Sequence, residues 1–254
     1  MDRWVGKTAV VTGASAGIGA AITVSLANAG LRVVGLARRP KLIDELKSKV
    51  TGKGEIHSRE CDISKTEEIA KTFKWIEDTF GGIDVLINNA AVLHVGSITD
   101  VGEGTLSEDS LLSTMDINVK GVISCTLRAV SSMKKRGFDG HIININSIAG
   151  HYIPSATIMN VYPSSKHAIT AFTASLNNEL TEFKNKIKTT SISPGLVKTE
   201  MVSRGLPADL KAAVQKAPAL QPQDVADAVM YSLSTPPNVN INELTIMAVT
   251  DKRL

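Results

Sequence analysis

Short apolar runs alternate with helical patterns along the whole chain, and this alternation restricts the possible folds more than any other feature. The apolar runs are unbroken, which is typical of strands that helices cover on both faces. Because strand–helix–strand crossovers are right-handed, the alternation predicts an α/β fold with a doubly wound parallel sheet. No shift in composition marks a second domain, so one domain is expected over residues 1–254. Strand patterns cover residues 7–13, 32–37, 55–61, 83–90, 140–147, 187–195 and 242–249. Helical patterns cover residues 18–30, 40–50, 64–80, 113–136, 160–183 and 222–233.

The composition argues against several classes of partner. The chain has 28 Lys and Arg against 25 Asp and Glu, a balance that does not favour nucleic acid or a membrane surface. The most apolar window, residues 18–37, is interrupted by Gly30 and Arg32, so it predicts a helix, a turn and a strand instead of a membrane span. The charged N-terminus and two isolated cysteines, Cys61 and Cys125, indicate a cytoplasmic protein without a cysteine metal site.

The first predicted strand ends in a glycine-rich turn, T-G-A-S-A-G-I-G, whose glycines are Gly13, Gly17 and Gly19. Glycine permits a tight turn and a close approach to a pyrophosphate, and the following helix offers free N–H groups to an anion. The spacing is G-x-x-x-G-x-G and differs from the common G-x-G-x-x-G fingerprint. A purely structural turn is the alternative. The position directly after the first strand favours a nucleotide, with Ser15 and Ile18 as further candidate contacts.

The second predicted strand ends in L-A-R-R-P, where the adenosine ribose of a dinucleotide is expected to lie. NAD binding favours an acidic residue at this place, which accepts from the 2′-hydroxyl. The chain has Arg38 and Arg39 instead, and a guanidinium group suits a 2′-phosphate. We therefore predict NADP(H), with Arg38 as the better candidate because it directly follows the strand. The alternative is a pair of solvated arginines that start a helix.

Two further strand ends carry candidate cofactor contacts. Asp62 follows the third strand, where its carboxylate either accepts from the adenine amino group or caps the next helix, and the two roles do not exclude each other. The fourth strand ends in N-N-A-A, so that the backbone at Asn89 and Ala90 is expected to lie flat against a ribose. Asn88 either belongs to that contact or ties neighbouring strands together.

Tyr162 and Lys166 stand four residues apart in Y-P-S-S-K and therefore share one face of a helix. A free phenol has a pKa of about 10, and a nearby ammonium group favours its ionised form. The pair is weak evidence by itself, since an exposed helical contact gives the same spacing. Three features strengthen it: Ser147 at the end of the fifth strand, Asn118 in D-I-N-V-K-G, and S-P-G-L-V-K-T after the sixth strand.

Taken in order, these motifs resemble the short-chain dehydrogenase/reductase family over essentially the whole chain. Within the family, G-H-I-I-N-I-N-S-I-A-G-H and P-N-V-N-I-N-E-L-T-I-M are most similar to the groups of insect farnesol dehydrogenases and of dehydrogenase/reductase family member 11. The resemblance implies a single-domain Rossmann fold with a seven-stranded sheet. It also implies reversible hydride transfer between NADP(H) and an alcohol or carbonyl compound, without a metal.

The resemblance assigns a role to each of four residues. Tyr162 is the general base toward an alcohol or the acid toward a carbonyl, a role that contributes about 10²- to 10⁴-fold in rate. Ser147 donates a hydrogen bond to the substrate oxygen, and Lys166 lowers the pKa of Tyr162 and binds the nicotinamide ribose. Asn118 is expected to hold a water molecule that links Lys166 to solvent.

After the sixth strand, the resemblance places Pro194, Gly195, Val197 and Thr199 at the cofactor, with Thr199 orienting the nicotinamide carboxamide. The chain departs from the family pattern at Asn146, where a second serine is common. This change does not put the catalytic assignment in doubt.

Two segments, residues 148–161 and 196–220, are rich in apolar side chains and are expected to form the substrate pocket. The alternative is that these side chains pack on the scaffold or on another subunit. A small apolar alcohol or carbonyl substrate is predicted, first an isoprenoid alcohol of the farnesol type, with steroid, retinal or dicarbonyl reduction as alternatives. A non-catalytic nucleotide sensor, and dehydration or epimerisation on the same fold, are further alternatives. The resemblance implies a homodimer or homotetramer formed through the helices near 113–136 and 160–183.

Overall fold

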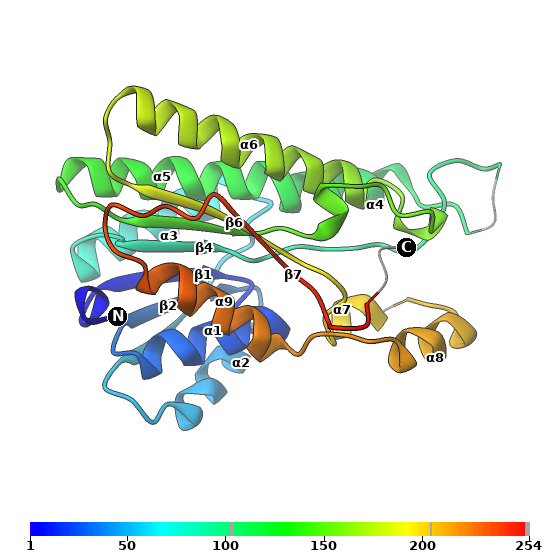
Figure 1. Cartoon of the computed structure of the whole chain (residues 1–254), viewed down its shortest axis with the longest axis horizontal. Helices are drawn as coiled ribbons and strands as arrows, with labels where there is room; N and C mark the ends of the chain where they lie inside the picture. Colours follow the sequence, from blue (N-terminus) through cyan, green and yellow to red (C-terminus); the bar gives the residue numbers. More distant parts are fainter. Residues whose placement is uncertain (102–103, 204, 252–254) are drawn as a thin grey trace.

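All seven strands of the computed structural model, which describes residues 1–101, 104–203 and 205–251, form one parallel sheet (Figure 1). The strand order is β3-β2-β1-β4-β5-β6-β7, so the chain reverses its direction of winding between β1 and β4. The predicted doubly wound sheet is therefore confirmed, and ligands of such sheets bind outside the carboxyl ends of the strands at the reversal. The strands are β1 (Thr8–Thr12), β2 (Arg32–Ala37), β3 (Glu55–Glu60), β4 (Val85–Asn88), β5 (His141–Ile145), β6 (Lys188–Pro194) and β7 (Glu243–Ile246).

Helices cover both faces of the sheet (Figure 1). On one face lie α1 and α9, which pack on each other; on the other face lie α3, α5 and α6. The helices are α1 (Gly17–Asn28), α2 (Lys41–Asp44), α3 (Thr66–Phe80), α4 (Glu108–Met115), α5 (Val122–Lys135), α6 (Tyr162–Glu182), α7 (Glu200–Ser203), α8 (Ala208–Lys216) and α9 (Pro222–Ser234). Among the described residues, no helix is long and apolar enough to cross a membrane.

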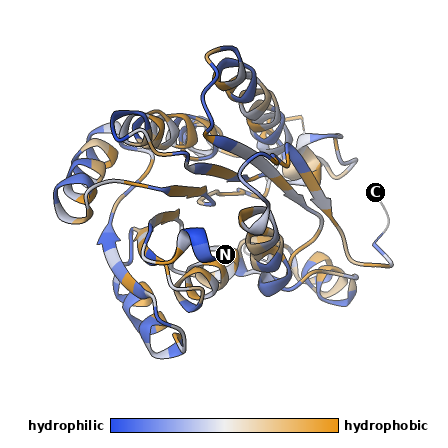
Figure 2. Ribbon diagram, turned by 60° about the vertical axis from the view of Figure 1, so that its left-hand side comes forward, coloured by the Kyte–Doolittle hydropathy of each residue, from blue (hydrophilic) through white to orange (hydrophobic). Residues whose placement is uncertain are grey.

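The core consists of two apolar layers, one on each side of the sheet. Successive strand residues point to opposite faces, so Val11 packs in the layer of α1 and α9, whereas Val10 packs in the layer of α3 and α5. Both are fully buried. The strands in the middle of the sheet are accordingly mostly hydrophobic (Figure 2).

The structure differs from the sequence-based expectations in three helical regions. The helix expected at residues 40–50 is divided into α2 and a 3-10 helix, Glu45–Lys49. The helix expected at 113–136 starts earlier and contains a π-helical segment, Asp116–Gly121, between α4 and α5. The segment 196–220 contains two short helices, α7 and α8, whose described residues are not buried and therefore leave no strong apolar period in the sequence.

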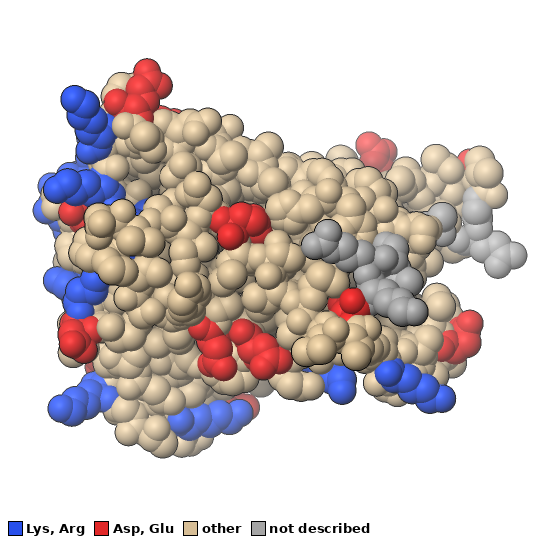
Figure 3. All heavy atoms as spheres, in the orientation of Figure 1, with Lys and Arg blue, Asp and Glu red and all other residues tan. Residues whose placement is uncertain are grey.

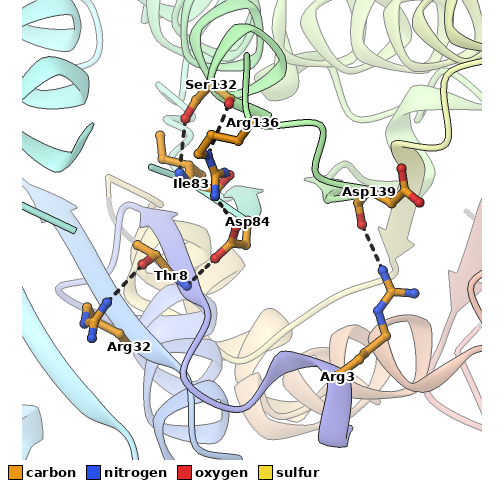
Figure 4. A network of polar contacts seen from close by, with 8 residues as sticks. All are labelled: Arg3, Thr8, Arg32, Ile83, Asp84, Ser132, Arg136 and Asp139. Carbon is orange, nitrogen blue, oxygen red and sulfur yellow. Dashed lines mark hydrogen bonds and ion pairs between the residues drawn. The ribbon is translucent and has the colours of Figure 1, made fainter. Parts of the chain in front are cut away.

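The amino ends of the strands carry a network of buried polar groups (Figure 4). Both carboxylate oxygens of Asp84 accept bonds, one from the backbone N–H of Thr8 at 2.9 Å and one from Arg136 at 2.8 Å. Arg136 also donates to the carbonyls of Ser132 and Ile83, and the Ser132 hydroxyl accepts from Ile83 N. In the view of Figure 3, lysine and arginine side chains gather at the left-hand edge of the molecule, whereas acidic side chains are spread over the whole face. Through Asp84 and Arg136, the network joins the start of β1, the residues before β4 and the end of α5, far from the carboxyl ends of the strands.

Candidate active site

The glycine-rich turn between β1 and α1 is held in a left-handed backbone conformation, with φ of +68° at Gly13 and +54° at Gly17. A side chain at Gly13 would also place its Cβ 2.8 Å from the Cα of Ala90, and one at Gly19 would overlap the carbonyl of Gly13. Packing of the turn against the end of β4 therefore requires glycine independently of any ligand. The structural explanation of the motif and the nucleotide explanation are both compatible with these contacts.

Helix α1 presents an N-terminus that suits an anion. Its N-cap residue, Ala16, provides no side-chain hydrogen bond, and its first turn contains no acidic residue. The first N–H groups of the helix therefore lack side-chain partners. Ser15 and Ile18, in the turn and in the first turn of α1, are half-buried beside these groups.

Thr199 meets this turn from the other half of the chain. Its Cγ2 atom lies 3.2 Å from the position that a Cβ on Gly17 would take. The Thr199 hydroxyl is buried and has no hydrogen-bond partner among the residues that the structure describes. A buried hydroxyl without a partner costs free energy, so it marks a place where a polar ligand atom fits. The residues present thus fit the predicted dinucleotide.

Thr12 and Asn89 brace the turn against β4. The Thr12 hydroxyl accepts from the backbone N–H groups of Asn89 and Ala90, both at 3.0 Å. In return, the Asn89 amide donates to the carbonyls of Thr12 at 2.8 Å and Gly13 at 3.3 Å. The Asn88 amide donates to Asn144 on β5 and to Thr126 on α5, which confirms that Asn88 ties neighbouring elements together. These bonds fix the two loops on either side of the point where the sheet reverses.

Arg38 and Arg39 follow β2 directly, and both are exposed to solvent. Burial acts to raise the pKa of Asp62, but hydrogen bonds from Ser64 and the charge of nearby Arg38 outweigh it, so the pKa is lowered. Asp62 accepts from the Ser64 backbone N–H at 3.0 Å and from its hydroxyl at 2.8 Å, so it caps the turn before α3. Arg38 and Asp62 therefore lie together at the carboxyl ends of β2 and β3.

Tyr162 and Lys166 lie on the same face of α6, as their spacing predicts. The Lys166 ammonium lies 5.6 Å from the centroid of the Tyr162 ring and donates to the carbonyl of Ile145 at 3.0 Å. Both side chains are buried, and Ser147 is close enough to the Tyr162 hydroxyl to act against the rise of its pKa. Proline at residue 163 fits the first turn of α6, where its missing N–H has no partner to lose. Residues from β5, the loop after it and α6 thus meet at one point.

Burial shifts the pKa of both ionisable groups toward their neutral forms. It raises the pKa of Tyr162 to about 12, although the hydrogen bond with Ser147 acts in the opposite direction. It lowers the pKa of Lys166 to about 8. The expected lowering of the Tyr162 pKa by Lys166 is thus not seen in the protein alone, because desolvation is the larger effect. A protonated phenol beside a readily neutralised amine suits proton donation near neutral pH.

Asn118 lies in the π-helical segment, and its side chain is engaged by the protein. Its amide donates to the carbonyl of Val92 at 3.0 Å and to the hydroxyl of Ser165 at 3.1 Å, and its oxygen accepts from Val92 N at 2.8 Å. Ser165 in turn donates to the carbonyl of Tyr162 at 2.7 Å. The side chain thus connects the segment after β4 with the start of α6. Sequence reasoning did not find Ser165, which resembles any small residue on a helix.

The predicted cofactor residues after β6 run along the C-terminal part of the chain. Gly195, next to Pro194, donates its N–H to the carbonyl of Ile246 at 2.8 Å. Val197 is buried and forms an isolated parallel bridge with Leu220. This bridge closes the base of the segment that carries α7 and α8 at the carboxyl ends of the strands (Figure 1).

Apolar side chains remain exposed on three segments at this end of the sheet. They are Ile98, Ile153 and Leu210, with exposed fractions of 52%, 67% and 37%. The segment with α7 and α8 comes near the loop after β4, since a Cβ on Gly205 would lie 3.9 Å from the Cβ of Val95. The segments 148–161 and 196–220, predicted to form the substrate pocket, contribute Ile153 and Leu210 to this exposed apolar surface.

The two histidines near the site have ordinary polar partners. His94 is within 3.1 Å of the Ser113 hydroxyl, and His151 is within 2.9 Å of the Ser193 hydroxyl and 3.5 Å of Glu243. Over residues 1–101, 104–203 and 205–251, no group of three His, Cys, Asp or Glu side chains is arranged to hold a metal ion. Both histidines are therefore engaged by side chains of the fold.

Comparison with known proteins gives the same picture as the geometry. The family model for short chain dehydrogenases matches residues 7–208. Farnesol dehydrogenase of Aedes aegypti is 46% identical over 99% of this chain and 100% of its own length. Dehydrogenase/reductase SDR family member 11 of Mus musculus is 38% identical over 96% of this chain and 95% of its own length.

Solved structures show the same fold. A closed form of serine dehydrogenase with NADP+ superposes with a TM-score of 0.84 at 30% identity and covers 96% of both chains. An alcohol dehydrogenase from the archaeon Thermococcus sibiricus with 5-hydroxy-NADP has a TM-score of 0.81 at 26% identity, covering 97% of this chain and 98% of that one. The matches of the family model and of these relatives over nearly the whole chain, together with the fold, show that the chain is an oxidoreductase that belongs to the short-chain dehydrogenase/reductase family.

Proposed function

We propose that this oxidoreductase transfers a hydride between NADP(H) and an apolar alcohol or carbonyl compound, with Tyr162 as the acid and base. The observation that carries the proposal is that the Lys166 ammonium lies 5.6 Å from the centroid of the buried Tyr162 ring, with Ser147 close enough to act on the Tyr162 hydroxyl. The bound nicotinamide would supply or accept the hydride. The Gly13–Gly19 turn, Arg38 and Thr199 would hold it.

In this proposal the chain's own residues handle the proton and the oxygen charge. Ser147 and Tyr162 donate hydrogen bonds to the substrate oxygen, which stabilises the charge that develops on it during carbonyl reduction. Tyr162 then delivers its proton to that oxygen, and Lys166 compensates the negative charge left on the phenol. Because burial keeps the Tyr162 pKa near 12, we expect reduction to proceed at neutral pH and alcohol oxidation to become faster as the pH rises.

The catalytic assignment is tested by replacing Tyr162 with phenylalanine. This variant should lose at least about 100-fold in kcat, because a positioned acid contributes 10²- to 10⁴-fold. Binding of NADPH, read by fluorescence titration, should stay within about twofold of wild type, which also shows that the variant is folded. Turnover at the wild-type rate would overturn the assignment.

The preference for NADP(H) over NAD(H) is tested at the two arginines after β2. Replacing Arg38 with aspartate should move the ratio of kcat/KM for NADPH and NADH toward NADH by about tenfold or more, since a charge-assisted hydrogen bond is worth about 1.5–3 kcal/mol. The same change at Arg39 is the matched control and should have a smaller effect, because Arg38 is the one whose charge acts on Asp62 at this site. An unchanged ratio in the Arg38 variant would discredit it as the phosphate contact.

The substrate class follows from the apolar segments around the site. Ile98, Ile153 and Leu210 are exposed at the carboxyl end of the sheet, and the relative of 46% identity is a farnesol dehydrogenase. We therefore rank an isoprenoid alcohol of the farnesol type first. A panel of farnesol, retinal, a steroid and a dicarbonyl compound, followed by the absorbance of the reduced nicotinamide, tests this order. Higher kcat/KM for a steroid or dicarbonyl than for farnesol would reject it.

We further propose that two or four copies of the chain associate through α5 and α6. Leu112 on α4 and Leu127 on α5 have exposed fractions of 54% and 63%, so these helices carry apolar surface without a partner in the monomer. Light scattering after size-exclusion chromatography should give the mass of a dimer or tetramer. Replacement of Leu127 with lysine should shift that mass toward the monomer, and a monomeric wild-type chain would refute the proposal.

A further inference from the structure

A non-glycine residue in the left-handed backbone conformation precedes the catalytic helix. Asn160 has φ of +43°, and it stands two positions before Tyr162, the first residue of α6. Only one other described non-glycine residue has a positive φ, Lys184 at +52°, just beyond the other end of the same helix. Asparagine tolerates this conformation better than most residues, but glycine tolerates it best. The chain thus has asparagine where backbone geometry alone would favour glycine.

The Asn160 side chain explains this choice, because it bonds to two separate segments. Its amide nitrogen lies 2.6 Å from the carbonyl of His94 and 3.3 Å from that of Gly96, both in the loop after β4. It also lies 3.0 Å from the carbonyl of Ile158. Its oxygen accepts from the backbone N–H of Val161 at 2.7 Å. One side chain therefore connects the loop after β4 with the residues that lead into α6.

The start of α6 has no ordinary helix cap. The N-cap residue of α6, Val161, has no side chain able to cap the helix, and the described structure shows no side-chain cap bond there. The position at which α6 starts decides where Tyr162 points, because Tyr162 is its first residue. If only the backbone hydrogen bonds of the first turn held the start of α6, the Tyr162 side chain would be placed less precisely.

The loop that Asn160 holds is anchored on its other side to the rest of the site. Val92 exchanges two hydrogen bonds with the side chain of Asn118, and Asn118 also donates to Ser165 on α6. The loop from Val92 to Gly96 is thus attached to α6 at two places, near Ser165 and before Tyr162. Two attachment points define an orientation, whereas one would leave the helix start free to pivot.

We propose that Asn160 is a positioning residue for Tyr162, acting through the amide hydrogen bonds that join the start of α6 to the loop at 94–96. It does not touch the reacting atoms. The inference rests on the proposed role of Tyr162 as acid and base. The amide donor carries the function, and the left-handed backbone conformation only allows the side chain to reach both carbonyl groups.

Three variants separate the hydrogen bonds from the backbone conformation. Asn160→Gly keeps the left-handed conformation and removes the amide, and we expect kcat to fall about tenfold or more, because small displacements of reacting groups cost up to 10²-fold. Asn160→Asp keeps an acceptor for Val161 but faces the carbonyls of His94 and Gly96 with a second acceptor, so its loss should be larger. Lys184→Gly is the matched control at the far end of α6 and should retain wild-type kcat.

A second measurement distinguishes positioning from a general structural role. If Tyr162 moves relative to Ser147, which acts to lower the Tyr162 pKa, the phenolate loses part of its stabilisation. The pH at which alcohol oxidation reaches half its maximal kcat should then rise by about half a unit or more in Asn160→Gly. KM for NADPH should stay within about twofold, because no cofactor contact is removed. Wild-type kcat and an unchanged pH profile in Asn160→Gly would overturn the proposal, as would a loss confined to KM.

The outcome can be told apart from a failure of the proposed function. If Tyr162→Phe loses turnover while both Asn160 variants keep it, the catalytic role stands and the positioning role is wrong. If Tyr162→Phe keeps turnover, the catalytic role is wrong and the Asn160 proposal falls with it. Should Asn160→Asp fail to fold, kcat and the pH profile of Asn160→Gly still decide the question. NADPH binding and far-ultraviolet circular dichroism then show that Asn160→Gly is folded.

Discussion

Two lysines, Lys166 on α6 and Lys188 on β6, are equally buried, each with 4% of its surface exposed, but they lie at opposite ends of the sheet. At the amino end, Lys188 donates to three oxygens, the hydroxyl and carbonyl of Thr235 and the carbonyl of Pro236. At the carboxyl end, Lys166 donates to a single carbonyl, that of Ile145. Among the described residues, the Lys188 ammonium thus has three hydrogen-bond acceptors, whereas the Lys166 ammonium has one and can still donate to a ligand.

Asp84 and Thr199 show the same contrast between the two ends, although the amino end also contains buried side-chain nitrogens without a described partner. Asp84 at the amino end has both carboxylate oxygens bonded, to Thr8 and Arg136. Thr199 at the carboxyl end has a buried hydroxyl without a partner. Leaving buried polar groups unpaired costs free energy, so the carboxyl end is expected to hold function at the expense of stability. Substitutions at the two ends should therefore separate turnover from stability.

The largest effect is expected for Lys166→Met. Turnover should fall by about 100-fold or more, since the proton transfer loses its cationic neighbour, while the free energy of unfolding should be unchanged or higher because a buried cation is removed. Burial lowers the pKa of Lys166 to about 8, below its unfolded value of about 10.4, so wild-type stability should rise with pH between about 8 and 10. Urea unfolding at several pH values measures this rise, which the variant should lack. A strongly destabilised variant would contradict the comparison.

The second effect concerns Asp84 in the network at the amino end. Asp84→Asn removes the carboxylate that faces Arg136 and should lower the free energy of unfolding by about 2–4 kcal/mol. The kcat of the remaining folded enzyme should equal that of wild type, because no residue of the candidate site is touched. Urea unfolding and initial-rate kinetics on the same preparation provide both numbers. A loss of kcat at full stability would show that the ends are coupled.

A third effect is expected at acid pH from His141, which is fully buried at the start of β5. Burial lowers its pKa to about 3, with smaller contributions from Lys188 and Arg3. The unfolded chain binds a proton at about pH 6.5, so stability should fall as the pH drops below 6.5, by up to about 1.4 kcal/mol per unit. At pH 5 the loss should be about 2 kcal/mol. His141→Gln should flatten this dependence, and an equally steep curve in that variant would assign the slope to other groups.

The smallest effect is expected for Lys188→Met, the counterpart of Lys166→Met. The variant leaves the carbonyls of Thr235 and Pro236 without their donor, and we expect a loss of about 1–2 kcal/mol in the free energy of unfolding. The kcat value should not change. If Lys188→Met were neutral for stability and Lys166→Met were not, the contrast between the two ends would be reversed.

Much of the fold could be predicted, because buried parallel strands leave a simple signal. The runs at β1, β2 and β4 are continuously apolar and matched the observed strands within a few residues. The π-helical segment Asp116–Gly121 and the helices α7 and α8 left no comparable signal. A π-helical segment of six residues is too short to show a period of its own, and helices without a buried face have no period to detect.

The candidate site could be predicted where spacing alone brings residues together. Tyr162 and Lys166 are neighbours on any α-helix, and the structure places them so. The hydrogen-bond partners of Asn118 and Asn160 could not be predicted, because they lie in the loop from Val92 to Gly96, far away in the sequence. The direction of the Tyr162 pKa shift could not be predicted from the sequence either, because it depends on how completely the phenol is removed from water.

The sequence by itself determined the doubly wound sheet, the turn at Gly13–Gly19 and the pairing of Tyr162 with Lys166, because each depends on local periodicity or on residues a few positions apart. Only the tertiary structure decided which buried polar groups are satisfied and which are left open. That decision is made by contacts between distant segments, such as Asp84 with Arg136 and Thr199 with the turn at Gly17. Desolvation and hydrogen bonding depend on those contacts, so the chemistry of a side chain is set by its surroundings in the fold.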